Sequence, residues 1–158
     1  MKAKITFLLL LFSAFFLNVM AQQGKPVLLL TNAKTGKSIK VCEQINPDKV
    51  EAILGKAITL DKEVPDDGDP PYFVFKYDGL LIELQDDKIK KVDITNKKWK
   101  LNSFTVGVLL EDIAAKHEKD DAKFVYDKRF KVKDSKAVIF AEIDNLQRVT
   151  KIGVIFKQ

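Results

Sequence analysis

Hydrophobic and polar residues alternate most clearly in the middle of the chain. Aromatic residues take every second position of residues 72–77, and Asp78-Gly79, which follows, is a strong signal for a two-residue hairpin turn. Residues 80–84 return with apolar side chains two apart, and residues 89–94 supply a third stretch of the same kind. The pattern predicts a three-stranded antiparallel meander.

Both ends of the remaining chain also have strand character. Residues 27–30 are apolar, and residues 38–41 return after a turn that contains Gly36, which predicts a first hairpin. Three stretches near the C-terminus have strand composition, namely residues 124–133, 137–143 and 149–156.

Two segments instead carry apolar residues at the spacing of an amphipathic helix. In the first segment Asn46 is a good N-cap, Pro47 suits the first helical position and Gly55 is a C-terminal stop. The stripe predicted to be buried consists of Val50, Ile53 and Leu54. The stripe of the second helix consists of Leu110, Ile113, Ala114 and His117.

The chain also resembles itself when it is shifted by 60 residues. Val50, Glu51, Ile53 and Lys56 then fall on Leu110, Glu111, Ile113 and Lys116. Ile89, Val92 and Ile94 fall on Val149, Ile152 and Val154. An amphipathic helix and a meander each need a partner to bury their apolar faces. We therefore predict an α+β fold, a single domain over residues 22–158 with two pseudo-repeats (about 41–98 and 101–157) whose helices pack on one face of the sheet.

The first residues of the chain have the order of a secretory signal peptide. Lys2 and Lys4 precede an apolar run over residues 5–17, and small or apolar residues lead up to Ala21. The run is shorter than the roughly 20 residues that a membrane-spanning helix needs, so we predict no membrane span. We expect cleavage near Ala21 and a periplasmic or secreted protein.

Charge and cysteine content limit the partners and the chemistry. The full chain of 158 residues has a formal net charge of +5, but lysine and acidic residues are interspersed without the basic stripe that nucleic-acid binding needs. The single cysteine, Cys42, has no partner for an intramolecular disulfide, and we interpret it as a small buried apolar residue.

The sequence carries no recognisable set of catalytic, cofactor or metal-binding residues. His117 is the only histidine, and Ser38, Ser103 and Ser135 all lie outside a Gly-x-Ser-x-Gly turn. The acidic loop over residues 61–71 has oxygen ligands but not the spacing of a calcium loop, so we interpret it as a solvated turn. We therefore predict a protein that is not an enzyme and that has no cofactor and no metal.

Several local motifs resemble the beta-lactamase-inhibitor-protein fold, which SmpA/OmlA-type envelope lipoproteins share. The similar segments are Phe104-Thr105-Val106-Gly107 before the second helix, Ile53-Leu54-Gly55-Lys56 after the first, and the hairpin Tyr77-Asp78-Gly79-Leu80. The cysteine pairs of the inhibitor and the Gly-x-Pro that often follows such helices are absent. The resemblance implies a non-catalytic binding module and transfers no contact residue to this chain.

If helices cover one face of the sheet, strand parity defines a second, open face. That face is predicted to carry Tyr72, Lys76, Glu83, Lys91, Asp93, Arg129, Lys131, Phe140 and Lys151. Aromatic residues mixed with arginine and lysine are typical of protein-binding surfaces. The predicted partner-binding residues are Tyr72, Lys76, Glu83, Lys91, Trp99, Arg129 and Lys131. Because Arg129, Lys131 and Lys133 share one parity, we expect the partner to be a protein with an acidic surface.

Two interpretations of the function follow. The first is an exported protein-binding module, in the form of a periplasmic immunity or inhibitor protein or of an envelope-assembly protein. The alternative is a module that binds a small ligand or lipid between sheet and helices. Such a cavity would be lined by Phe73, Phe75, Tyr77, Ile139, Phe140 and Phe156.

Overall fold

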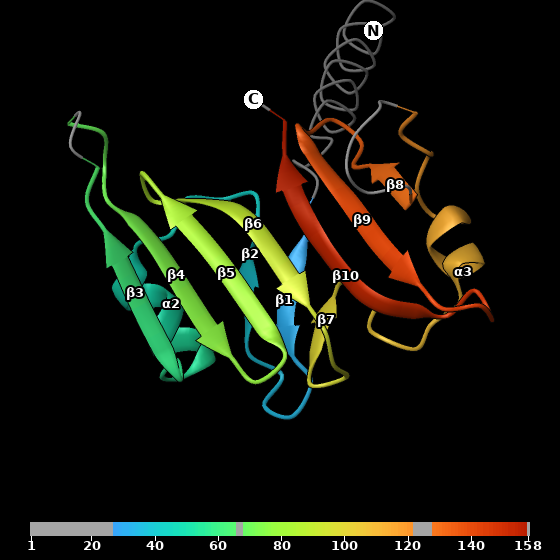
Figure 1. Ribbon diagram of the computed structural model, residues 1–158, viewed down its shortest axis with the longest axis horizontal. Coiled ribbons are helices and arrows are strands. Elements are labelled where there is room, and N and C mark those ends of the chain that lie inside the picture. The colour runs from blue at the N-terminus through green and yellow to red at the C-terminus, as the bar shows by residue number, and fades with distance from the viewer. Residues whose placement is uncertain (1–26, 66–67, 122–127, 158) are drawn as a thin grey trace, which may run out of the picture.

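The computed structural model describes residues 27–65, 68–121 and 128–157. The predicted signal peptide lies outside these residues, and so do two residues of the acidic loop, 66–67. The described residues form a seven-stranded sheet, a three-stranded sheet and two helices (Figure 1). No helix within these ranges combines the length and the apolar character that crossing a bilayer requires.

All neighbouring strands of the seven-stranded sheet are antiparallel. In spatial order they are β3 (Thr59–Glu63), β4 (Tyr72–Tyr77), β5 (Leu80–Gln85), β6 (Lys88–Ile94), β10 (Val149–Phe156), β9 (Ala137–Ile143) and β8 (Lys128–Lys131). The predicted meander is confirmed as β4, β5 and β6, and Gly79 takes the positive φ of 74° that the tight turn requires.

The smaller sheet lies on one side of the larger one (Figure 1). Its strand order is β2 (Ser38–Lys40), β1 (Leu29–Asn32) and β7 (Trp99–Leu101). The first hairpin is confirmed as β1 and β2. β7 was not predicted, because a three-residue strand between polar residues shows no alternation that a sequence reading can detect.

The two helices are α2 (Pro47–Leu54) and α3 (Leu110–Ala114). α2 confirms its predicted signals, since the Asn46 side chain accepts a hydrogen bond of 2.9 Å from the Lys49 amide and Gly55 ends the helix at a φ of 95°. α3 begins after Leu109, which has no capping side chain, and it has only five residues.

The predicted fold class is therefore wrong. The described residues are mostly β, with 47% strand and 11% helix, and they do not fit tandem helix-plus-meander repeats with helices packed on the sheet. The physical reason is that a second sheet, and not a pair of helices, supplies much of the apolar surface that covers the large sheet. α3 is also too short to cover a sheet face of this width.

The central pair of strands has a symmetrical register. Asp93 of β6 lies opposite Gly153 of β10, 60 residues further along the chain, and Val92 lies opposite Val154. A local two-fold axis between β6 and β10 would produce this register. The helices do not follow it, because α2 has eight residues and α3 has five.

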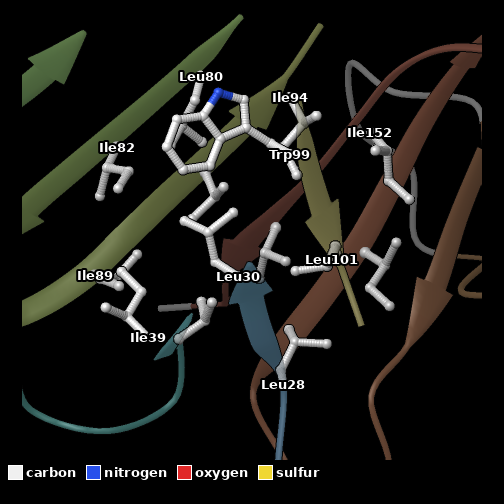
Figure 2. Packing of buried hydrophobic residues seen from close by; sticks show 14 of the residues in the cluster. Leu28, Leu30, Ile39, Leu80, Ile82, Ile89, Ile94, Trp99, Leu101 and Ile152 are labelled. Atoms are coloured by element: carbon white, nitrogen blue, oxygen red, sulfur yellow. The ribbon is translucent and has the colours of Figure 1, made fainter. Parts of the chain in front are cut away.

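The main core lies between the two sheets (Figure 2). Leu30 of β1 and Leu101 of β7 are fully buried, as are Ile82, Ile94 and Ile152 of the large sheet. Strand alternation places these side chains on facing surfaces, so both sheets bury one face.

The predicted loop over residues 61–71 is wrong in its first part, because Asp61, Lys62 and Glu63 belong to β3. β3 is an edge strand in which every residue is exposed, so burial leaves no alternating pattern in its sequence.

Candidate protein-binding face

The seven-stranded sheet has one face toward the small sheet and a second face on the opposite side, which we call the outer face (Figure 1). Directly paired residues of an antiparallel sheet share a face, so the register identifies the side chains of the outer face. One row across it consists of Lys76, Leu81, Asp93, Gly153, Phe140 and Arg129. The next row consists of Val74, Glu83, Lys91, Ile155, Val138 and Lys131.

Charged side chains of alternating sign cross four strands of the outer face. We call this set the charge ladder, and its members are Glu83, Lys91, Asp93, Lys151 and Glu142. The Lys91 ammonium lies 3.7 Å from Glu83 and 3.1 Å from Asp93. The Lys151 ammonium lies 3.3 Å from Asp93 and 3.4 Å from Glu142. Each charge has a neighbour of opposite sign, so the ladder keeps the face polar without a strong net field.

Asp93 is the most buried member of the charge ladder, with 11% of its side chain exposed. Its Oδ2 atom contacts both lysines, whereas its Oδ1 atom is buried without a hydrogen bond inside the described part of the chain. Charges that are withdrawn from solvent are screened less by salt than exposed pairs. The two lysines neutralise the Asp93 carboxylate, and burying this carboxylate without a charged partner would cost free energy of folding.

Tyr72 extends the ladder to β4. Its hydroxyl donates a hydrogen bond of 2.5 Å to the Glu83 carboxylate. Burial of the phenol raises the pKa of Tyr72 above its ordinary value, and the hydrogen bond to Glu83 and the negative charges of Glu83 and Glu63 raise it further. The protonated hydroxyl is thus a fixed donor on this face.

An aromatic side chain lies at the centre of the β9–β10 pair. Phe140 is fully buried and lies opposite Gly153. The Lys151 ammonium lies 5.7 Å from the centre of the Phe140 ring, within the range of a cation–π contact. The β9 side of the outer face is therefore closely packed.

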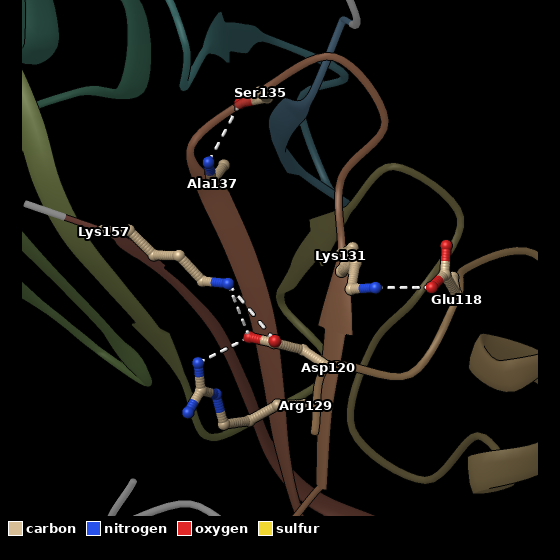
Figure 3. A network of polar contacts seen from close by, with 7 residues as sticks. All are labelled: Glu118, Asp120, Arg129, Lys131, Ser135, Ala137 and Lys157. Atoms are coloured by element: carbon tan, nitrogen blue, oxygen red, sulfur yellow. Dashed lines mark hydrogen bonds and ion pairs between the residues drawn. The ribbon is translucent and has the colours of Figure 1, made fainter. Parts of the chain in front are cut away.

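Arg129 has an internal role, and it is not an exposed contact residue. Its side chain is 1% exposed and its guanidinium lies 2.5 Å from the Asp120 carboxylate, which Lys157 also contacts at 3.1 Å (Figure 3). Asp120 is itself buried, so the two cations compensate a carboxylate that has left water. The network ties residues 118–120 to β8 and to the end of β10.

The other predicted contact residues separate into two groups. Lys76 and Lys131 lie on the outer face about half exposed, and each is paired, with Asp61 at 2.8 Å and with Glu118. Trp99 lies in the core, 4% exposed, and its indole N–H donates a hydrogen bond of 2.9 Å to the Asp78 carbonyl. The structure therefore places Trp99 away from the face that carries Tyr72, Lys76, Glu83 and Lys91.

Sequence reasoning overlooked further members of the face. Glu142 completes the charge ladder, and four apolar residues lie in the two rows, namely Val74, Leu81, Val138 and Ile155. Their strand parity was available in the sequence. Without the order β6-β10-β9, however, nothing places Lys151 between Asp93 and Glu142.

His117 packs at the end of the α3 segment. Its ring meets Phe104 edge-on at 5.7 Å, and Nδ1 lies 3.3 Å from the Lys131 carbonyl. Ser38, Ser103 and Ser135 contact Thr31, Lys116 and Cys42 respectively. Within residues 27–65, 68–121 and 128–157, no group of three or more His, Cys, Asp and Glu side chains has an arrangement that could hold a metal ion.

Residues predicted to line a ligand cavity lie mainly in the core. Phe75 and Ile139 are fully buried among the residues that join the two sheets, and Phe73, Tyr77 and Phe156 pack against them. Phe140 belongs to the outer face instead. The space between the sheets is therefore occupied by side chains of the protein at these positions.

Comparisons with protein families, with curated proteins and with solved structures found no match for this chain. The resemblance to the beta-lactamase-inhibitor-protein fold stays a prediction.

Proposed function

We propose that this protein is an exported, non-enzymatic binding module that contacts another protein through the outer face of its large sheet. One observation carries the proposal. The strand register places the charge ladder and the partly exposed apolar residues Val74, Leu81 and Ile155 side by side on this face. Mixed polar and apolar composition over several strands is typical of protein interfaces. An immunity or inhibitor protein and an envelope-assembly protein are two concrete forms of this function.

Internal ion pairs change what the outer face offers a partner. The charge of Arg129 is compensated by Asp120, that of Lys131 by Glu118, and those of Lys91 and Lys151 by the ladder. A partner that docks here therefore meets fixed hydrogen-bond donors and acceptors and apolar side chains, and no concentrated positive charge. We expect binding to this face to depend weakly on salt.

The experiment compares capture from the host's envelope extract by immobilised wild type and by two variants. Leu81→Arg places a long charged side chain on the outer face beside Asp93, whereas Ile58→Arg makes the same chemical change at a position that is 71% exposed and off that face. We expect Leu81→Arg to abolish capture of the wild-type partner and Ile58→Arg to retain it. Circular dichroism and the thermal midpoint check that both variants are folded.

Equal capture by both variants would place the contact elsewhere. Turnover of a substrate by the purified wild type, lost in Leu81→Arg, would replace the proposal with a catalytic function. Either result would overturn the binding function that we propose for the outer face.

A further inference from the structure

Lysine side chains surround one end of the two-sheet structure, away from the outer face. A cavity of about 400 Å³ opens there between the segment after β2 and the ends of β6, β9 and β10. The apolar lining consists of Val41, Ile89 and Phe156. The charged lining consists of Lys88, Lys90, Lys136, Lys157 and Glu43. We call this the lysine-walled cavity.

The cavity has an excess of positive charge. Its single acidic residue, Glu43, already bonds Lys40 at 2.8 Å. Lys88 bonds Asp86, and Lys157 bonds Asp120. Lys90 and Lys136 form no ion pair with any of the described residues. Two ammonium groups beside an apolar floor are therefore available to an anion.

A second cavity adjoins the first and extends the positive surface. It has a volume of about 580 Å³ and shares Lys157 with the lysine-walled cavity. Val132, Ala137 and Val138 line it, together with Lys116, Lys131 and Lys133 and with the acidic residues Glu118 and Asp134. Lysines outnumber acidic residues in this lining, although Lys131 is paired with Glu118. The positive field at this end of the molecule thus comes from lysines on several elements.

We infer that the lysine-walled cavity binds a carboxylate-rich peptide segment that inserts an apolar side chain onto the floor of Val41, Ile89 and Phe156. The inference rests on the proposed function, and it names the chemistry of one part of the partner. The spacing of the lysines, and their position around an apolar floor, favour a peptide. The lysines come from β6, from the residue before β9 and from the residue after β10, so they suit several spaced carboxylates better than a single head group. The alternation of acidic and apolar residues in an extended segment matches the lysine rim and apolar floor.

Cys42 supplies a reporter at this cavity. It is the only cysteine of the chain, it is exposed, and it lines the cavity beside Glu43. A bound segment would cover its thiol. Alkylation of Cys42 therefore reports occupancy of the cavity independently of the affinity measurement.

The test uses a short fluorescein-labelled peptide of alternating glutamate and leucine, with fluorescence anisotropy as the readout. The test variant is Lys90→Gln with Lys136→Gln. The matched control is Lys34→Gln with Lys37→Gln, which removes the same charge from the β1–β2 turn at the opposite end of the molecule (Figure 1). We expect the test variant to bind about tenfold more weakly than wild type and the control to change by less than about twofold.

Three further results bear on the inference. The peptide should slow alkylation of Cys42, and its glutamine analogue should not. Equal weakening by the test variant and the control would overturn the inference, because it would show attraction to the net charge alone. Vesicles that contain phosphatidylglycerol and displace the peptide at lower concentration would also overturn it in favour of a lipid head group.

The two proposals fail separately. If the peptide does not bind while capture from extract still depends on Leu81, the inference about the cavity falls and the proposed function stands. If the peptide binds but capture is the same for Leu81→Arg and Ile58→Arg, the outer face is not the contact surface. The proposed function of that face then falls, and peptide binding at the lysine-walled cavity remains.

Discussion

The ring of Phe140 on β9 occupies the space beside Gly153 on β10 that a side chain at residue 153 would need. The two residues lie opposite each other in the sheet, and a β-carbon added to Gly153 would lie 2.5 Å from Cζ of Phe140 and 2.0 Å from the Val92 carbonyl oxygen. Close packing on both sides of the strand thus requires glycine here, although its φ is not in the left-handed region.

We predict that Gly153→Ala destabilises the protein by about 2 kcal/mol or more, because the backbone of β6 must move away from β10. Chemical denaturation measures the loss. Thr150→Ala on the same strand is the control, since Thr150 is exposed and its replacement should change the free energy of unfolding by less than about 0.5 kcal/mol. Equal stability of wild type and Gly153→Ala would show that β6 and β10 tolerate a wider spacing.

A second prediction concerns the buried pair of Arg129 and Asp120. Reversal of Arg129 to glutamate places two carboxylates together in a buried site, so we expect a loss of about 3–5 kcal/mol and unfolding at much lower temperature. Lys131→Glu is the control, because Lys131 is about half exposed and its neighbour Glu118 is exposed too. Calorimetry that shows similar thermal midpoints for both variants would contradict the structural role of Arg129.

The burial of Arg129 differs from what strand parity alone predicts. Arg129, Lys131 and Phe130 alternate in the sequence as an exposed cationic face would, and Arg129 does lie on the outer face. What the sequence cannot reveal is that Asp120 reaches it from a segment outside the strand. Burial of a charge depends on tertiary contacts, whereas strand parity is local.

Local signals were reliable where the backbone itself sets the rule. Asn46 begins α2 and Gly55 ends it, as predicted, and Gly79 makes the hairpin turn. Trp99 shows the limit of such signals. Its strand has only three residues, which is too short to show an alternating pattern that would distinguish a buried tryptophan from an exposed one. The burial of Trp99 depends on the pairing of β7 with β1.

The third prediction concerns the ionisation of the tyrosines. Burial raises the pKa of Tyr77 to about 12, with a smaller effect of the Glu51 charge, and the pKa of Tyr72 is raised as well. The folded state thus favours both neutral phenols. Their stabilising effect is complete below the unfolded pKa of about 10 and is lost as the pH rises through the folded pKa. Stability should therefore fall above about pH 10.

Ultraviolet difference spectroscopy of tyrosinate measures these transitions. Tyr72→Phe should remove one late transition, and Glu83→Gln should lower the pKa of Tyr72, because it removes the negative charge that the phenolate would face. Tyr77→Phe is the reference for the other transition. If Glu83→Gln leaves the Tyr72 transition where it is in wild type, the carboxylate does not control that phenol.

The last prediction concerns the reactivity of Cys42, whose exposure corrects our expectation of a buried apolar residue. Although the residue is exposed, partial desolvation of its thiol raises the pKa of Cys42, and the charge of Glu43 raises this pKa further. The Ser135 hydroxyl, 3.9 Å away, lowers the pKa. The alkylation rate should therefore reach its midpoint at a higher pH than for a free thiol. Ser135→Ala should move the midpoint up and Glu43→Gln should move it down. A midpoint that is equal in wild type and both variants would show that neither side chain acts on the thiolate.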